Sequence, residues 1–156
     1  MTVYEYNVRL NELRLPILRE GAKYNIDARV AFNNPEKVRN LASEILDLEN
    51  AAEEYCYVLA LDNKCKLKGL YEVGHGTVDV SIVDVRGIFQ KALFLGASKI
   101  ILMHNHPSGD PTPSKDDISL TERVRNAGEI LDIRLLDHIV IGYGNYISLV
   151  EHGYLK

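Results

Sequence analysis

Cysteines and long apolar runs are scarce in this 156-residue sequence, and each scarcity excludes a class of protein. Cys56 and Cys65 are too few and too close together for a disulfide framework or a Cys-based zinc site, so we expect two reduced structural thiols. No apolar run approaches the length of a membrane span. The first residues, MTVYEYNVR, contain no apolar core of a signal peptide, so we expect a cytoplasmic location and no membrane partner.

Positive charge is not in excess. The 18 Lys and Arg against 22 Asp and Glu give a net charge of -4, whereas a broad phosphate-binding surface needs a clustered basic excess. Nucleic acid is therefore an unexpected partner, although this balance does not exclude a small local patch. The rest of the composition, 46% hydrophobic and 26% charged, is ordinary for a globular protein with one full core.

The pattern of apolar residues predicts an α/β fold. Residues 1–33 alternate in places, which predicts one or two strands in an N-terminal extension, and the main domain is expected over 34–156. Asn34 and Pro35 are typical of a helix start. The expected elements are helices at 34–49, 85–95 and 114–130, and strands at 55–61, 66–73, 78–83, 100–103, 133–141 and 146–150. This order predicts a mixed β-sheet flanked by helices.

Two histidines one residue apart end the expected strand at 100–103, in the stretch MHNHPSGDPTPSKDD. Strand side chains alternate between faces, so His104 and His106 project to the same side and can converge on one metal ion. The prolines of the following loop restrict its backbone and bring the next helix close. With Asp117 in the first turn of that helix, three ligands suit a catalytic zinc ion that keeps water in the fourth position.

The same residues also allow a purely structural interpretation. Ser114 followed three residues later by Asp117 is an ordinary helix-capping pattern, and a His-x-His pair can occur at a surface by coincidence. The two interpretations are compatible, because a capping serine can also point its hydroxyl into a cleft.

The spacing from His104 to Asp117 matches H-x-H-x7-S-x2-D, the JAMM motif of the JAB/MPN metallopeptidases. The wider stretch HNHPSGDPTPSKDD and the later LLDHIVIG resemble the RadC-like branch of that group over about residues 35–154. The resemblance implies an α/β sandwich similar to cytidine deaminases, with Zn²⁺ held by His104, His106 and Asp117. It also implies that Ser114 stabilises the tetrahedral intermediate. The deaminase motif itself, H-x-E with P-C-x-x-C, is absent.

The family's general base is a glutamate at the start of the strand before the hairpin, and it acts through the zinc-bound water. Here the sequence EEYCYVLALD offers Glu53 and Glu54, and the family spacing to Asp62 favours Glu54. The alternative is that both belong to a solvated acidic helix end.

Four further side chains have possible roles beside this motif. Thr121 lies one helical turn after Asp117, where it can bond either the ligand carboxylate or a backbone carbonyl. Asn105 points to the opposite side of the strand from the two histidines and is expected to tie down the loop that follows. His138 lies in an apolar strand and is expected to be structural, whereas nothing in the sequence places His75 at a cleft.

Two functions follow from these observations. The first is a zinc metallopeptidase that cleaves a peptide or isopeptide bond of a peptide or protein substrate. The second is a nucleic-acid-associated accessory protein, labelled for DNA repair, whose zinc site is structural or vestigial. Longer RadC-like proteins carry an N-terminal helix-hairpin-helix module, but residues 1–33 lack its Gly-x-Gly hairpin. A full set of catalytic residue types favours the enzyme, because a structural zinc site normally closes its fourth position with protein.

Overall fold

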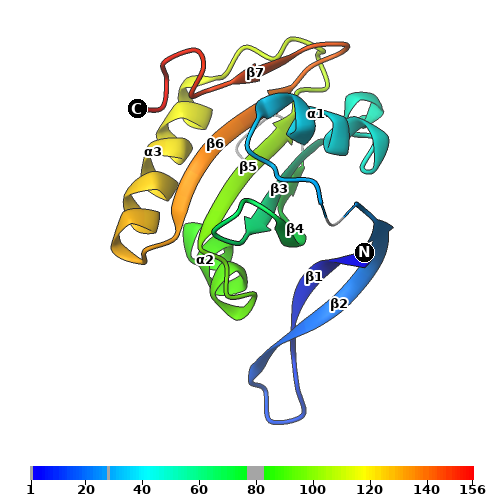
Figure 1. Cartoon of the computed structure of the whole chain (residues 1–156), viewed down its shortest axis with the longest axis vertical. Helices are drawn as coiled ribbons and strands as arrows, with labels where there is room; N and C mark the ends of the chain where they lie inside the picture. Colours follow the sequence, from blue (N-terminus) through cyan, green and yellow to red (C-terminus); the bar gives the residue numbers. More distant parts are fainter. Residues whose placement is uncertain (1, 28, 77–82) are drawn as a thin grey trace.

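The computed structural model describes residues 2–27, 29–76 and 83–156, which form a seven-stranded mixed sheet with helices on both faces (Figure 1). The elements are β1 (Thr2–Leu10), β2 (Pro16–Asn25), α1 (Pro35–Glu44), a 3-10 turn (Leu48–Asn50), β3 (Glu54–Leu61), β4 (Leu67–Gly76), α2 (Val85–Phe94), β5 (Lys99–Asn105), α3 (Lys115–Ile130), β6 (Arg134–Ile141) and β7 (Tyr146–Ser148). The strand order is β2-β1-β4-β3-β5-β6-β7. Most of the strand predicted at 78–83 lies outside the described residues.

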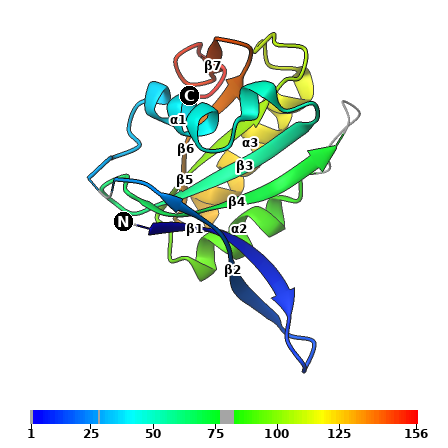
Figure 2. The same ribbon diagram turned by 90° about the vertical axis from the view of Figure 1, so that its right-hand side faces the viewer.

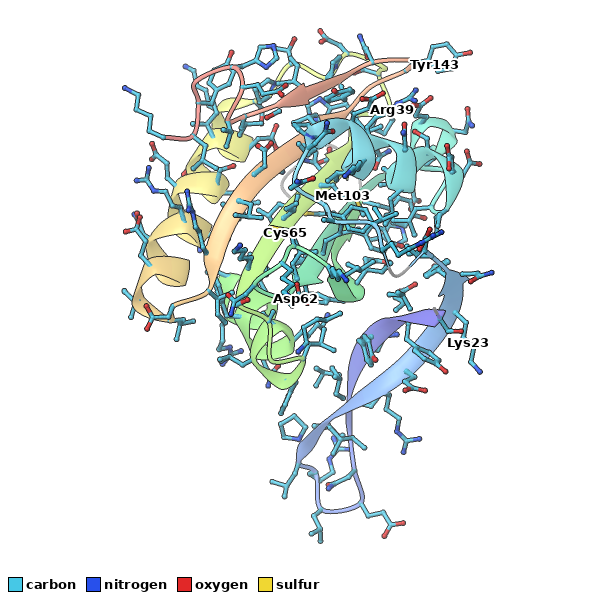
Figure 3. The ribbon with its side chains drawn as sticks, in the orientation of Figure 1. Lys23, Arg39, Asp62, Cys65, Met103 and Tyr143 are labelled. Carbon is cyan, nitrogen blue, oxygen red and sulfur yellow. The ribbon has the colours of Figure 1, made fainter. Side chains whose placement is uncertain are left out.

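The sheet separates two hydrophobic cores. Successive side chains of β5 point to opposite faces of the sheet, so β5 contributes residues to both cores. Ile100 and Leu102 pack in one core with residues of α2 and α3. Ile101 and Met103 pack in the other core with residues of α1, and Figure 3 labels Met103 on β5 between these layers. The same alternation turns His104 toward the side of the sheet that α3 covers. The predicted mixed sheet with flanking helices is confirmed.

The N-terminal strands form an antiparallel hairpin that projects away from the rest of the molecule (Figures 1 and 2). The strands expected in this segment are confirmed. The hairpin joins the main sheet where β1 pairs with β4 in parallel, Glu5 opposite Leu70. Among the described residues, no helix combines the length and apolar character that crossing a membrane requires.

One sequence expectation about α2 is wrong. The apolar spacing predicts that Ile88, Leu93 and Phe94 face the core, and Ile88 does. Leu93 and Phe94, however, are 55% and 49% exposed. Successive helical residues advance by about 100°, so the buried face runs through residues 88, 89 and 92 and leaves residue 94 on the far side. The helix ends at Phe94, and Gly96 follows the C-cap residue with a positive φ of 59°, a conformation that glycine adopts readily.

Candidate metal centre

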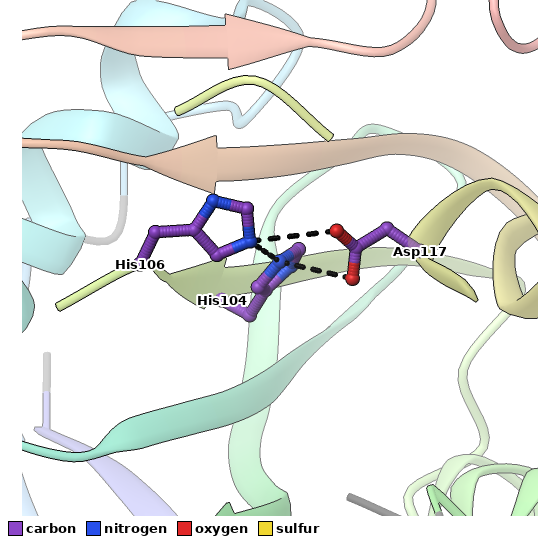
Figure 4. A group of neighbouring side chains, drawn as sticks. All are labelled: His104, His106 and Asp117. Atoms are coloured by element: carbon purple, nitrogen blue, oxygen red, sulfur yellow. Dashed lines mark hydrogen bonds and ion pairs between the residues drawn. The ribbon is translucent and has the colours of Figure 1, made fainter. Parts of the chain in front are cut away.

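One residue of β5, one residue just after it and one residue of α3 converge where β5 ends and α3 begins (Figure 4). The Nε2 atoms of His104 and His106 lie 3.0 Å apart. Asp117 Oδ1 lies 3.2 Å from His104 Nε2, and Asp117 Oδ2 lies 3.4 Å from His106 Nε2. Within the described ranges, these three residues form the group of potential metal ligands whose donor atoms all lie within 4.8 Å of one another.

The donor atoms lie close enough together to share one metal ion. A tetrahedral zinc ion with bonds of about 2.0–2.2 Å keeps its ligands about 3.3–3.6 Å apart, since a tetrahedron's edge is about 1.6 times its centre-to-vertex distance. The Nε2 atoms of the two histidines are 3.0 Å apart, and each lies 3.2 or 3.4 Å from a different oxygen of the Asp117 carboxylate. With one donor atom from each residue, all three atoms lie within 4.8 Å of one another, so the two imidazoles and the carboxylate can hold one metal ion.

The proline-rich loop fixes the ring of His106. His106 Nδ1 donates to the backbone carbonyl of Asp110 at 2.8 Å, which leaves the Nε2 lone pair facing His104 and Asp117. The loop is held in turn by the β6–β7 connection, where Tyr143 N donates to the carbonyl of Gly109 at 2.9 Å. A Cβ at Gly142 would lie 2.4 Å from that same carbonyl, so only glycine allows this close approach. The loop thus holds the ring of His106 in one orientation.

A capping box places Asp117. Ser114 Oγ accepts from Asp117 N at 3.1 Å, and the Asp117 carboxylate accepts from Ser114 N at 2.7 Å. The Ser114 hydroxyl also donates to Asp117 Oδ2 at 2.8 Å. The predicted capping pattern is confirmed. The cap also orients the carboxylate toward the two histidines.

The Asp117 carboxylate is negatively charged over the whole ordinary pH range. Burial alone would raise the pKa of Asp117, but the imidazoles of His104 and His106 beside the carboxylate outweigh burial and hold that pKa well below its usual range. The neighbouring Asp117 carboxylate is also the main cause that raises the pKa of His106, while burial opposes it. A carboxylate that is only 13% exposed and stays ionised favours a cation beside it.

The two candidate bases lie in different surroundings. Glu54 opens β3 two residues before Cys56, which pairs with His104 across the strands, so Glu54 and His104 share a face of the sheet. The Asp117 carboxylate and the Asp110 carbonyl are larger causes of the raised pKa of His106, and the negative charge of Glu54 raises that pKa further. The Glu53 carboxylate instead contacts His75 of β4.

Cys56 does not join the ligand group. Burial is the main cause that raises the pKa of its thiol to about 12, and the charges of Glu54 and Asp117 add to the effect. A protonated thiol is a poor metal ligand. Cys56 and Cys65 are both free, in agreement with the expectation of reduced thiols.

Asn105, between the two histidines, holds the start of β3. Its Oδ1 accepts from Tyr55 N at 2.8 Å, and its Nδ2 donates to the carbonyl of Glu53 at 2.9 Å. The side chain is buried, with 1% of the residue exposed. The amide therefore holds the backbone on both sides of Glu54. The expectation that Asn105 ties down the loop after β5 is wrong, because its side chain bonds the start of the neighbouring strand β3.

Replacement of Asn105 by alanine is expected to lower the free energy of unfolding by about 1–3 kcal/mol, because two partly buried backbone groups lose their partner. Urea denaturation followed by circular dichroism measures this change. The exposed Asn126 on α3 provides the control, since Asn126→Ala should leave the unfolding free energy nearly unchanged. Equal effects of the two substitutions would contradict the role of Asn105.

His138 and Thr121 lie directly behind the three ligands. His138 Nε2 is 2.7 Å from His104 Nδ1, and His138 Nδ1 is 2.6 Å from Thr121 Oγ1. Thr121 Oγ1 donates to the backbone carbonyl of Asp117 at 2.6 Å, so of the two predicted roles the backbone bond is right and the carboxylate bond is wrong. The helix directs the hydroxyl four residues back along its own backbone, away from the carboxylate. Burial lowers the pKa of His138 well below its usual value.

Comparison with known proteins agrees with the motif and the fold. The family model described as RadC-like JAB domain matches residues 32–154. The chain belongs to this family. A UPF0758 protein of Pelobacter propionicus is 48% identical over 109 residues, which are 70% of this chain and 48% of that protein. UPF0758 proteins of Caldanaerobacter subterraneus and Geobacter sulfurreducens are 40% and 39% identical over 90% and 94% of this chain, and 57% and 59% of their own lengths.

The chain spans about half the length of these curated relatives. The expected α/β sheet and the convergence of the motif's two histidines and aspartate are both present in this chain. The names of the relatives assign no chemical activity.

Removal of any one ligand is expected to abolish stoichiometric zinc binding. The purified chain should carry about one zinc ion, and His104→Ala, His106→Ala and Asp117→Asn should each lose most of it, because two ligands do not complete the site. Metal analysis by mass spectrometry after desalting gives the stoichiometry. His152→Ala is the matched control, because His152 is an exposed histidine near the C-terminus, and this variant should keep its zinc. Stoichiometric zinc in the Asp117→Asn variant would contradict the ligand assignment.

Proposed function

We propose that this RadC-like JAB domain is a zinc metallopeptidase that hydrolyses a peptide or isopeptide bond in a peptide or protein substrate. The observation that carries the proposal is the convergence of His104, His106 and Asp117, whose donor atoms all lie within 4.8 Å of one another. A set of three protein ligands with a fourth position open is typical of catalytic zinc, whereas structural zinc is closed by four protein ligands. When bound there, zinc lowers the pKa of water toward about 7 and polarises a substrate carbonyl.

Glu54 is proposed as the general base. Its place on the same face as His104, at the start of β3, supports this role over that of Glu53, whose carboxylate pairs with His75. The Glu54 carboxylate takes a proton from the attacking water and later delivers a proton to the leaving amine. Asn105 supports the position of Glu54 by holding the peptide groups on either side of it.

Ser114 is proposed to stabilise the oxyanion. Its hydroxyl lies at the N-terminus of α3 and donates to Asp117 Oδ2 at 2.8 Å. Rotation about the Cβ–Oγ bond of Ser114 redirects the hydroxyl proton toward a substrate oxygen, while the backbone N–H of Ser114 keeps its bond to Asp117. The positive end of the helix dipole adds to this stabilisation.

A cleavage screen tests the proposal. The zinc-loaded chain is incubated with a mixed-sequence peptide library and with isopeptide-linked substrates, and new amino termini are identified by mass spectrometry. Cleavage by the wild type and its absence with the Asp117→Asn variant is the expected result. An intact zinc site that cleaves neither class would refute the proposal and favour the alternative of an accessory protein.

A further inference from the structure

A chain of hydrogen bonds runs behind the ligands and links two of them. It begins at the backbone carbonyl of Asp117, passes through Thr121 Oγ1 at 2.6 Å and reaches His138 Nδ1 at 2.6 Å. From His138 Nε2 it continues to His104 Nδ1 at 2.7 Å. Thr121, His138 and His104 are 1%, 0% and 2% exposed, so each of these bonds lies inside the protein. A helix, a neighbouring strand and the ligand-bearing strand are thereby tied together.

The direction of every bond in this chain follows from its first member. A backbone carbonyl only accepts, so the Thr121 hydroxyl donates its proton to Asp117 and must itself accept from His138 Nδ1–H. A neutral imidazole with its proton on Nδ1 has a lone pair on Nε2, and that lone pair accepts from His104 Nδ1–H. His104 Nε2 is then left without a proton, on the side that faces His106 and Asp117.

We infer that His138 and Thr121 are positioning residues that select the metal-binding tautomer and ring orientation of His104. The inference rests on the metal centre of the proposed function. The backbone carbonyl of Asp110 fixes the tautomer and ring orientation of His106 in the same way, because it accepts the Nδ1–H of His106. For His104, which is enclosed in the sheet, the acceptor is a side chain, His138, and the tautomer of His138 is set by Thr121 in turn. Groups that orient a ligand in this way typically change metal affinity about 10–100-fold when they are replaced.

Thr121→Val and Thr121→Ser form the decisive pair of variants. Valine keeps the shape of threonine and removes the hydroxyl, whereas serine keeps the hydroxyl. Zinc affinity is measured by competition with a chromogenic chelator, and the unfolding free energy of the metal-free chain is measured separately. Zinc binding should weaken about 10–100-fold in Thr121→Val and stay close to the wild-type value in Thr121→Ser.

His138→Phe and a spectroscopic measurement complete the test. Phenylalanine fills the buried position without a nitrogen, so it should also weaken zinc binding. Long-range ¹H–¹⁵N correlation spectra of the metal-free, histidine-labelled wild type should show His104 protonated on Nδ1, and Thr121→Val should reduce the population of this tautomer. A purely structural role would lower the unfolding free energy without moving the tautomer or the zinc affinity.

Unchanged zinc affinity in folded Thr121→Val protein overturns the inference, as does a His104 protonated on Nε2 in the wild type. If the His138→Phe protein does not fold, the comparison of Thr121→Val with Thr121→Ser tests the inference by itself. No substrate enters these measurements. A protein that cleaves nothing but shows the expected affinities therefore refutes the proposed peptidase and supports the inference about His138.

Discussion

Substitution of Glu54 by glutamine is expected to reduce peptide hydrolysis by roughly 10²–10⁴-fold while the chain still binds about one zinc ion. Glutamine has nearly the same size and keeps a carbonyl oxygen, but it cannot take a proton from water. Glu54 is absent from the group of metal-binding donors, so its replacement leaves that group intact. Steady-state kinetics on a substrate from the cleavage screen, with parallel metal analysis, measures both quantities.

Glu53→Gln is the matched control for this prediction. The two glutamates are adjacent in sequence, and Glu53 forms its ion pair with His75 on a surface where both side chains are about half exposed. Surface ion pairs of this kind contribute little to stability, so the control should fold, bind zinc and cleave normally. An inactive Glu53→Gln protein beside an active Glu54→Gln protein would exchange the roles of the two residues.

Local features of the fold were predictable from the sequence. The N-cap of α1 is an example, since Asn34 Oδ1 accepts from Lys37 N at 3.3 Å, and Pro35 follows at the first helical position. Such caps depend on residues three apart, which the sequence displays directly. The convergence of His104 and His106 was predictable for the same reason, because strand alternation alone turns them to one side.

Contacts that depend on strand order were not predictable in this way. His138 reaches His104 across 34 residues because β6 pairs with β5 in parallel, with Leu102 opposite His138. A single sequence contains no signal for which strands become neighbours, so His138 was expected only to be structural. The histidine in the apolar strand segment LLDHIVIG was nonetheless a usable clue, because a buried imidazole needs partners for both of its nitrogens.

Replacement of Ser114 separates its two functions, helix cap and proposed oxyanion donor. Ser114→Ala removes both the cap and the hydroxyl donor. We expect the free energy of unfolding to fall by about 1 kcal/mol and kcat to fall by roughly 10²–10³-fold. Ser114→Thr keeps a hydroxyl that can do both, so its stability and its kcat should stay near the wild-type values. Thermal unfolding and single-substrate kinetics at saturating zinc provide the two measurements.

Ser114→Gly is the informative variant, because glycine is tolerated at an N-cap with a loss of only about a few tenths of a kcal/mol. It removes the hydroxyl that donates to Asp117 Oδ2 at 2.8 Å but keeps the backbone N–H that donates to the same oxygen at 2.7 Å. The ligand carboxylate thus retains one of its two bonds to residue 114, and zinc should remain bound at saturating metal. We therefore expect a stable, zinc-loaded protein whose kcat is as low as that of Ser114→Ala. Near-normal turnover by Ser114→Gly would instead mean that the hydroxyl serves only the cap and that the oxyanion is stabilised by another group.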